Sequence, residues 1–238
     1  MIEIYNTILY QPLFNAVVFL YNLIPGSDFG LAIIALTALI RLAFFPLSVK
    51  TIQSQRALSR INPKVNEIKN KFKNDAPAQS AAIMQLYKDH KVNPFFGCLP
   101  LLIQLPILIA LYSAFGAGFK PESLGMLYSF IGNPGRIEPI SLGFLDISAK
   151  SAILAIITGA FQYLQLKQNQ NLTSLSGSDS GQGGQKEVQA LNKQMLYFFP
   201  VMIIIIGWNL PAALLLYWLT TTLFSMAEQS YIRMKYKD

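Results

Sequence analysis

The feature that most constrains this fold is an arginine inside an otherwise uncharged apolar run. Residues 29–49, FGLAIIALTALIRLAFFPLSV, contain one charged residue, Arg41. A helix of this length, at about 1.5 Å per residue, extends roughly 30 Å, the thickness of the hydrocarbon core of a bilayer. A cation near the middle of that core costs from about 3 to more than 10 kcal/mol. We expect no Asp or Glu within an apolar run to neutralise Arg41, which should therefore face water or substrate in a polar cavity.

The composition indicates a polytopic membrane protein. Of the 238 residues, 53% are hydrophobic and 13% are charged, whereas soluble domains carry about 25% charged residues. The chain has one cysteine, Cys98, and one histidine, His90. We therefore expect no intrachain disulfide, no histidine-based metal cluster and no cofactor. Because Arg41 is the first basic residue, we also expect no cleavable signal peptide.

Five apolar runs fit membrane-spanning helices, which predicts an all-α fold with five transmembrane helices. The predicted segments are an outer-surface amphipathic helix (1–28), span one (29–50), a cytoplasmic helical hairpin (51–93), span two (94–116), an extracytoplasmic loop (117–148), span three (149–166), a cytoplasmic linker (167–193), span four (194–209), span five (211–231) and a cytoplasmic tail (232–238). The last three spans are short, which implies tilt or a thinned bilayer. For the N-terminal segment, a short re-entrant element is the alternative to a surface helix.

The charge distribution orients these segments. Residues 50–93 carry nine Lys/Arg against three acidic residues, whereas residues 1–30 carry two acidic residues and no basic one. Since cytoplasmic loops are rich in Lys and Arg, we expect the N-terminus outside and the C-terminus inside. Within the cytoplasmic segment, Val65, Ile68 and Phe72 recur at helical spacing before the break at Pro77. This pattern predicts two antiparallel helices.

Several polar groups also lie within the predicted spans. These groups are Gln104, Gln162, Gln165 and the threonines 220–222. Each has a structural explanation, because a Gln side chain can hydrogen-bond a neighbouring helix and a Thr hydroxyl can hydrogen-bond the backbone of its own helix. Together with Arg41 they could line one groove. Arg41 has a structural alternative too, in which it bonds backbone carbonyls or reaches the cytoplasmic interface. The sequence offers no pair of buried Asp, no Ser with a nearby base and no Walker-type loop, so we do not expect an enzyme.

Three segments carry a resemblance to a known family. They are 10–58, which contains the arginine described above, VNPFFGCLPLLIQLPILIALY (92–112) and NLPAALLLYW (209–218). The chain resembles the bacterial, YidC-type members of the YidC/Oxa/Alb family of membrane protein insertases. The resemblance implies a five-helix core around a hydrophilic groove that is open to the cytoplasm and to lipid but closed to the outside.

The resemblance also implies roles for residues. Positions that match groove-lining residues are Thr37, Arg41, Gln104 and Trp218, with Gln162 or Gln165 as the polar group of the third span. The hairpin 51–91 matches an element that recruits substrates. Compared with other members of the family, we expect no large periplasmic domain of the kind found in many Gram-negative members, no lipoprotein signal and no long basic C-terminal tail. Strong ribosome docking through the tail is therefore not expected.

The implied function is that of a non-enzymatic membrane protein insertase and chaperone in the bacterial plasma (inner) membrane. A hydrophilic segment of a nascent membrane protein, often acidic, would pair transiently with Arg41 in a positively charged groove while its apolar helix moves into lipid. We expect action as a monomer with nascent chains and lipid as partners, no specific nucleic acid, and the ribosome and Sec translocon as further candidates. Two alternatives stay open: a small anion channel or transporter that binds its substrate at Arg41, and a purely structural membrane-assembly factor.

Overall fold

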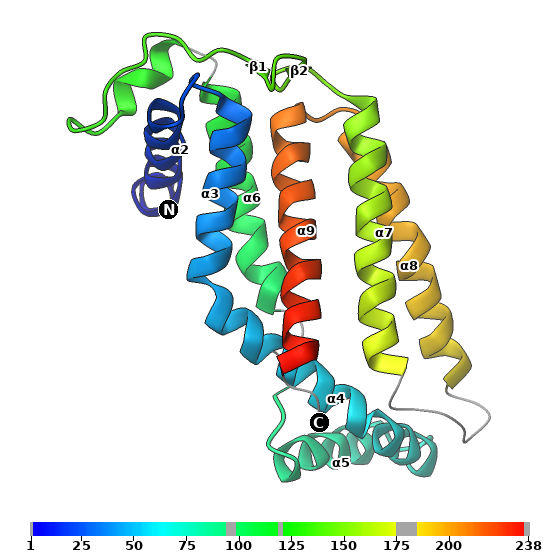
Figure 1. The fold of residues 1–238 in the computed structure, drawn as a ribbon. Coiled ribbons are helices and arrows are strands. Elements are labelled where there is room, and N and C mark those ends of the chain that lie inside the picture. The colour runs from blue at the N-terminus through cyan, green and yellow to red at the C-terminus, as the bar shows by residue number, and fades with distance from the viewer. Residues whose placement is uncertain (1, 94–98, 119–120, 175–184, 236–238) are drawn as a thin grey trace.

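The computed structural model describes residues 2–93, 99–118, 121–174 and 185–235, and this part of the chain is mostly helical (Figure 1). The helices are α1 (Ile2–Tyr5), a π-helical turn (Asn6–Tyr10), α2 (Gln11–Leu23), α3 (Phe29–Ala43), α4 (Phe45–Lys71), α5 (Ala76–Asp89), α6 (Leu99–Gly118), α7 (Ala152–Ser174), α8 (Gln185–Gly207) and α9 (Ala212–Lys235). A 3₁₀ helix (Pro121–Met126) and the antiparallel pair β1 (Ile140–Ser141) and β2 (Leu145–Asp146) complete the elements. The helical character predicted from the sequence is confirmed.

The apolar run 29–49 forms two helices where one straight helix was expected. α3 ends at Ala43 and α4 begins at Phe45, with an angle of 63° between them. Pro46 lies in the first turn of α4. Proline is tolerated in a first turn because the N–H groups there have no partner within the helix. In a continuous helix its ring would clash with the preceding turn, so the helix bends before Pro46. Arg41 therefore lies in the last turn of α3 and not at the middle of a straight span.

The last three long helices exceed their predicted lengths. α7, α8 and α9 contain 23, 23 and 24 residues, so each helix extends beyond the apolar run predicted to cross the membrane. The predicted linker 167–193 is helical at both of its described ends, while residues 175–184 lie outside the described ranges, as do 94–98 at the start of the predicted second span. By length and composition, none of the described helices qualifies alone as a membrane span, although bent α3 and α4 qualify together, and 104–116 and 196–207 are shorter apolar stretches.

α2, which lies in the segment expected to form an outer-surface helix, packs one face into the hydrophobic core. Its residues Phe14, Val17 and Val18 have no exposed surface. The helix runs beside the upper part of α3 in Figure 1 and also contacts α6. One face of α2 is thus covered by protein, whereas Phe19 and Leu23 of the same helix are exposed.

Polar side chains of α2 hold the loop 121–148 against the upper end of the helices. Asn15 donates to the carbonyl of Met126 (3.1 Å) and accepts from the backbone N–H of Tyr128 (2.7 Å). Asn22 donates to the carbonyl of Gly132 (2.6 Å). Because Asn15 is almost fully buried, these bonds satisfy a group that would otherwise destabilise the core.

Asp28 fixes the same loop to the start of α3. Its carboxylate caps the helix by accepting from the N–H of Leu31 (3.0 Å), and it also accepts from Ser141 Oγ (2.6 Å) and the N–H of Leu142 (2.7 Å). Partial burial raises the pKa of Asp28, but these hydrogen bonds outweigh that effect and hold the pKa below its ordinary value. Gly30 allows the close approach, because a Cβ there would collide with the Ser141 side chain.

α4 and α5 form the antiparallel hairpin that the sequence predicts. Gln79 donates to the carbonyl of Lys69 (3.1 Å) near the turn, and Lys64 contacts His90 (3.1 Å between Nζ and Nε2) at the far end. Asp75 caps α5 by accepting from the N–H of Ala78. The first helix of the hairpin is longer than predicted, because α4 starts at the bend after α3 and continues through its internal proline.

Candidate functional site

A cavity of about 420 Å³ lies between α3, α4, α6, α7, α8 and α9. It brings together every groove residue predicted from the sequence: Thr37, Arg41, Gln104, Gln162, Gln165 and Trp218. The choice between Gln162 and Gln165 is therefore unnecessary, because both line the wall. α4 adds Ser48, Thr51 and Gln55 to the lining, and neither Thr51 nor Gln55 was predicted from the sequence as a groove residue.

The cavity does not extend to the end of the bundle that carries the loop 121–148. Among the described residues, none of that loop and none of α2 lines the wall. At that end the fully buried Phe29, Ile147 and Ala213 fill the space between the helices. Backbone hydrogen bonds from Ala213 to Ile147 and from Ala212 to Ala149 (both 2.8 Å) tie the start of α9 to the loop. The polar space is thus confined to the half of the molecule that adjoins α4.

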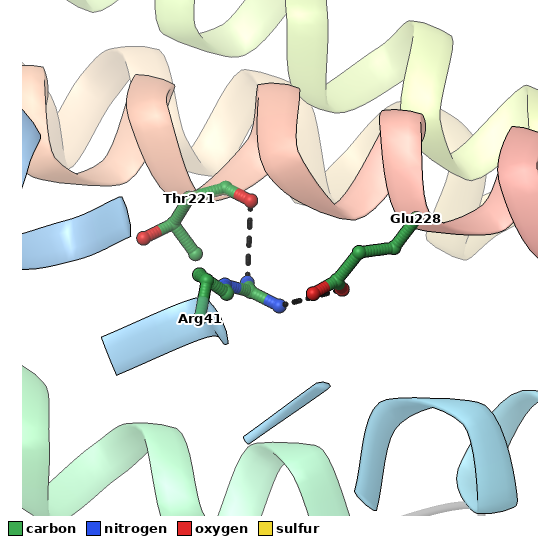
Figure 2. A network of polar contacts seen from close by, with 3 residues as sticks. All are labelled: Arg41, Thr221 and Glu228. Atoms are coloured by element: carbon green, nitrogen blue, oxygen red, sulfur yellow. Dashed lines mark hydrogen bonds and ion pairs between the residues drawn. The ribbon is translucent and has the colours of Figure 1, made fainter. Parts of the chain in front are cut away.

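Arg41 crosses from α3 to α9, where it makes two contacts (Figure 2). Its Nη1 lies 3.4 Å from Glu228 Oε2, and its Nη2 donates to the carbonyl of Thr221 (3.2 Å). Thr221 and Glu228 are seven residues apart in α9, so they lie on the same face of the helix. The guanidinium therefore bridges two turns of the facing helix.

The expectation that no carboxylate neutralises Arg41 is wrong. Glu228 lies inside the segment predicted as the fifth span, so the sequence did contain a carboxylate in an apolar run. Glu228 was overlooked because it lies near the end of that run and 187 positions from Arg41. Within the described part of the lining, Arg41 and Glu228 are the only charged residues. The cavity consequently has no formal net charge, in contrast to the positively charged groove that was expected.

A second polar cluster joins α7 to α9. Trp218 Nε1 donates to Gln162 Oε1 (3.2 Å), and Thr222 Oγ1 donates to the same oxygen (3.3 Å). Gln162 Nε2 in turn donates to Gln165 Oε1 (2.9 Å). These bonds orient the amides along the wall, so Trp218 acts here as a fixed part of the cavity wall.

Thr37 and Gln104 have more structural roles. The Thr37 hydroxyl donates to the carbonyl of Ile33 (2.7 Å) in its own helix and is almost fully buried. Gln104 donates to the Tyr217 hydroxyl (2.6 Å), which links α6 to α9. One further lining residue, Gln229, has a buried Oε1 with no hydrogen-bond partner in the described ranges. A buried acceptor of this kind is stabilised when a ligand or water donates to it.

The fold and the cavity define a class of protein: a helical bundle, with an appended helical hairpin, that encloses polar space and an ion pair between apolar helices. Arrangements of this type suit the binding of a polar segment beside lipid-compatible surface. Outward-facing apolar side chains are abundant on the same helices, including Leu39, Leu105 and Ile205.

Comparison with known proteins places the chain within one family. The model of the family described as "60Kd inner membrane protein" matches residues 19–238. The chain is 34% identical to the membrane protein insertase YidC of Fusobacterium nucleatum subsp. nucleatum over 209 residues, 88% of each chain. It is also 34% identical to the insertase YidC of Geobacter sp. (strain M21) over 224 residues, which is 93% of this chain and 36% of that protein. The match to the YidC of Streptomyces avermitilis is 28% identical over 235 residues, 89% of this chain and 54% of that protein.

The chain therefore belongs to the 60Kd inner membrane protein family, and the resemblance to YidC-type members of the YidC/Oxa/Alb family is confirmed. It spans about a third of the length of the Geobacter relative, whereas it spans most of the Fusobacterium one.

Proposed function

We propose that this chain is a membrane protein insertase that admits hydrophilic segments of nascent membrane proteins into the cavity beside Arg41. The observation that carries the proposal is the convergence of six predicted groove residues on one cavity, in a chain whose curated relatives are named membrane protein insertase YidC. The insertase does no covalent chemistry in this proposal. It lowers the barrier to translocation by shortening the apolar path that a polar segment must cross.

The membrane arrangement forms part of the same proposal. The bent α3–α4 segment, α6, α7, α8 and α9 supply five crossings of a bacterial inner membrane. The N-terminus and the loop 121–148 lie outside, and the hairpin of α4 and α5 lies in the cytoplasm. The nine basic residues of 50–93 support this orientation, because basic loops remain cytoplasmic. With this orientation, the cavity adjoins the cytoplasmic hairpin, and packed core residues separate it from the outside.

The proposed cycle uses the polar wall and the apolar exterior in turn. The hairpin recruits a nascent chain, and a short hydrophilic segment enters the cavity, where Arg41 can pair with an acidic side chain. The adjoining apolar stretch of roughly 20 residues then partitions into lipid along the exposed apolar surface of the helices. Nascent membrane proteins and lipid are the partners, the ribosome and Sec translocon are further candidates, and one chain suffices.

The rival proposal, an anion channel or transporter with its binding site at Arg41, is less well supported. Glu228 lies 3.4 Å from the guanidinium and would compete with a small anion as it competes with an acidic segment, but the curated relatives are named membrane protein insertase YidC, which favours the insertase. A purely structural assembly factor would leave the cavity without a role and predicts that Arg41 can be replaced without loss of insertion.

Reconstitution tests the proposal directly. The purified chain in proteoliposomes should insert a model substrate that has one apolar helix of about 20 residues and a short N-terminal tail, and the tail should become protected from added protease. A photo-crosslinking residue in place of Trp218 should capture the tail during insertion. Insertion no better than in protein-free liposomes, or crosslinking of the tail only to residues outside the cavity, would overturn the proposal.

Arg41 variants test the electrostatic part. Arg41→Ala should reduce insertion of acidic tails by roughly tenfold, a loss of about 1.4 kcal/mol, because Glu228 then leaves the cavity negatively charged. Arg41→Lys should preserve most of the activity, and neutral tails should be less affected. Arg136→Ala, in the exposed loop, is the matched control. If folded Arg41→Ala inserts acidic tails as well as the parent does, the structural explanation of Arg41 is correct.

A further inference from the structure

We infer that Glu228 is a specificity-determining residue: it is an internal counterion that occupies the place of an acidic substrate side chain and sets how strongly the cavity prefers acidic segments. The inference rests on the proposed insertase function and deepens it. Two independent observations support it, the loose geometry of the Arg41–Glu228 contact and the balance of charge within the cavity.

The geometry of the ion pair suits exchange. The pair has a single N–O contact of 3.4 Å, whereas charge-assisted bonds of this kind are typically about 2.7–2.9 Å, and a strong Arg–carboxylate pair is often bidentate. The other contact of the guanidinium is a neutral carbonyl, that of Thr221. Both members of the ion pair line the cavity. A second carboxylate entering the cavity can therefore approach Arg41 and replace Glu228 without rearrangement of the helices.

The charge balance gives Glu228 its effect on selection. With both residues charged, the cavity has no formal net charge, so a neutral segment enters without electrostatic bias. An acidic segment must either displace Glu228 or place a second carboxylate beside it, which like-charge repulsion opposes. Glu228 therefore weakens the binding of acidic segments compared with a cavity that held Arg41 alone.

The same competition assists release. A solitary arginine in a partly enclosed, low-dielectric space would hold an acidic segment strongly. Glu228 stays attached to α9 at high local concentration and can pair with Arg41 again as the segment leaves. The Glu228 carboxylate also has the Ser48 side chain of α4 beside it, a partner that does not depend on Arg41. Exchange of one carboxylate for another keeps occupancy transient, as repeated insertion requires.

The test compares acidic-tailed and neutral-tailed versions of one substrate in proteoliposomes with Glu228→Gln. The ratio of acidic to neutral tails captured by the photo-crosslinker at position 218 should rise at least about threefold, and protease-protected acidic product should appear more slowly. Glu138→Gln is the matched control, because Glu138 also faces an arginine (Arg136, 3.7 Å) but is exposed and far from the cavity. It should keep the parental ratio.

The double variant Arg41→Gln/Glu228→Gln provides a second test if the single variant folds poorly, because removing both charges leaves no unpaired charge in the cavity. Its cavity is neutral without an ion pair and should show no preference between the two tails. An unchanged ratio in folded Glu228→Gln, or an acidic preference that persists in the double variant, would overturn the role of Glu228. A parent chain that inserts neither substrate would instead overturn the proposed function, so the two failures can be told apart.

Discussion

Arg41 and Glu228 meet across 187 positions of sequence, and each depends on the other for its charge to be tolerated. Their side chains are 20% and 9% exposed. Removing one member of a buried pair leaves an uncompensated charge, which destabilises by up to about 3–5 kcal/mol and by less where water has access. Variants of either residue therefore need a folding control, such as the unfolding temperature of the purified protein, before any loss of insertion is attributed to substrate binding.

Asp28 offers a residue-scale prediction about stability. Its carboxylate caps α3 and accepts two bonds from the loop 121–148, including the N–H of Leu142. Asp28→Ala should lower the free energy of unfolding by about 1–2 kcal/mol. The measurement is thermal unfolding in detergent at neutral pH, with Asp89→Ala on exposed α5 as the control. Equal effects of the two substitutions would contradict the assigned role.

The pH dependence of that contribution has a definite sign. Because hydrogen bonds hold the folded-state pKa of Asp28 below the ordinary 3.8, its contribution is present above that value and is lost as the pH falls through the lowered pKa. The stability difference between the parent and Asp28→Asn should therefore be constant from neutral pH down to about 5 and shrink below about 4.

At the scale of elements, the packing of α7 on α8 depends on a glycine. A Cβ at Gly159 would lie 2.5 Å from Cγ1 of Ile204 and 3.1 Å from the carbonyl oxygen of Pro200. Gly159→Ala should therefore separate the two helices and lower the unfolding temperature by several degrees. Gly116→Ala in α6 is the matched control, because a Cβ there meets nothing within 4 Å and alanine favours the helix. A stabilising effect at both positions would show that the α7–α8 contact can relax.

The hairpin of α4 and α5 should be the least stable helical part of the described chain. α5 has no buried residue, whereas α6 contains the fully buried Ala110, Leu111 and Ala114. Local opening is easiest where few apolar contacts hold an element. Amide hydrogen exchange in detergent or nanodiscs should be faster over 64–90 than over 104–115. Equal protection in both segments would count against a mobile recruiting arm.

At the scale of the whole molecule, the proposed orientation can be tested with single cysteines in a Cys98→Ser background. Asn74, at the turn of the hairpin, and Asn133, in the loop 121–148, are both exposed. An impermeant maleimide added to intact cells should label Asn133→Cys and leave Asn74→Cys unlabelled until the membrane is opened. Labelling of Asn74→Cys from outside would contradict the topology.

Much of the element order follows from local properties of the sequence. Hydrophobic periodicity and turn residues predict where helices form, since they depend on neighbours within one or two turns. The helical fold and the two helices of the hairpin were predictable in this way. The family was recognisable because three segments, around Arg41, 92–112 and 209–218, carry its patterns.

The tertiary structure decided what depends on contacts between distant segments. The burial of α2 arises when packing against α3 and α6 selects one conformation among those that the local sequence permits. The pairing of Arg41 with Glu228 could not follow from hydropathy, because a moving average over an apolar run contains no information on which faces of two helices meet. The sequence alone predicts a helical membrane protein with one arginine, Arg41, inside an apolar run. Only the packing of α3 against α9 places Glu228 beside Arg41 and leaves the cavity without formal net charge.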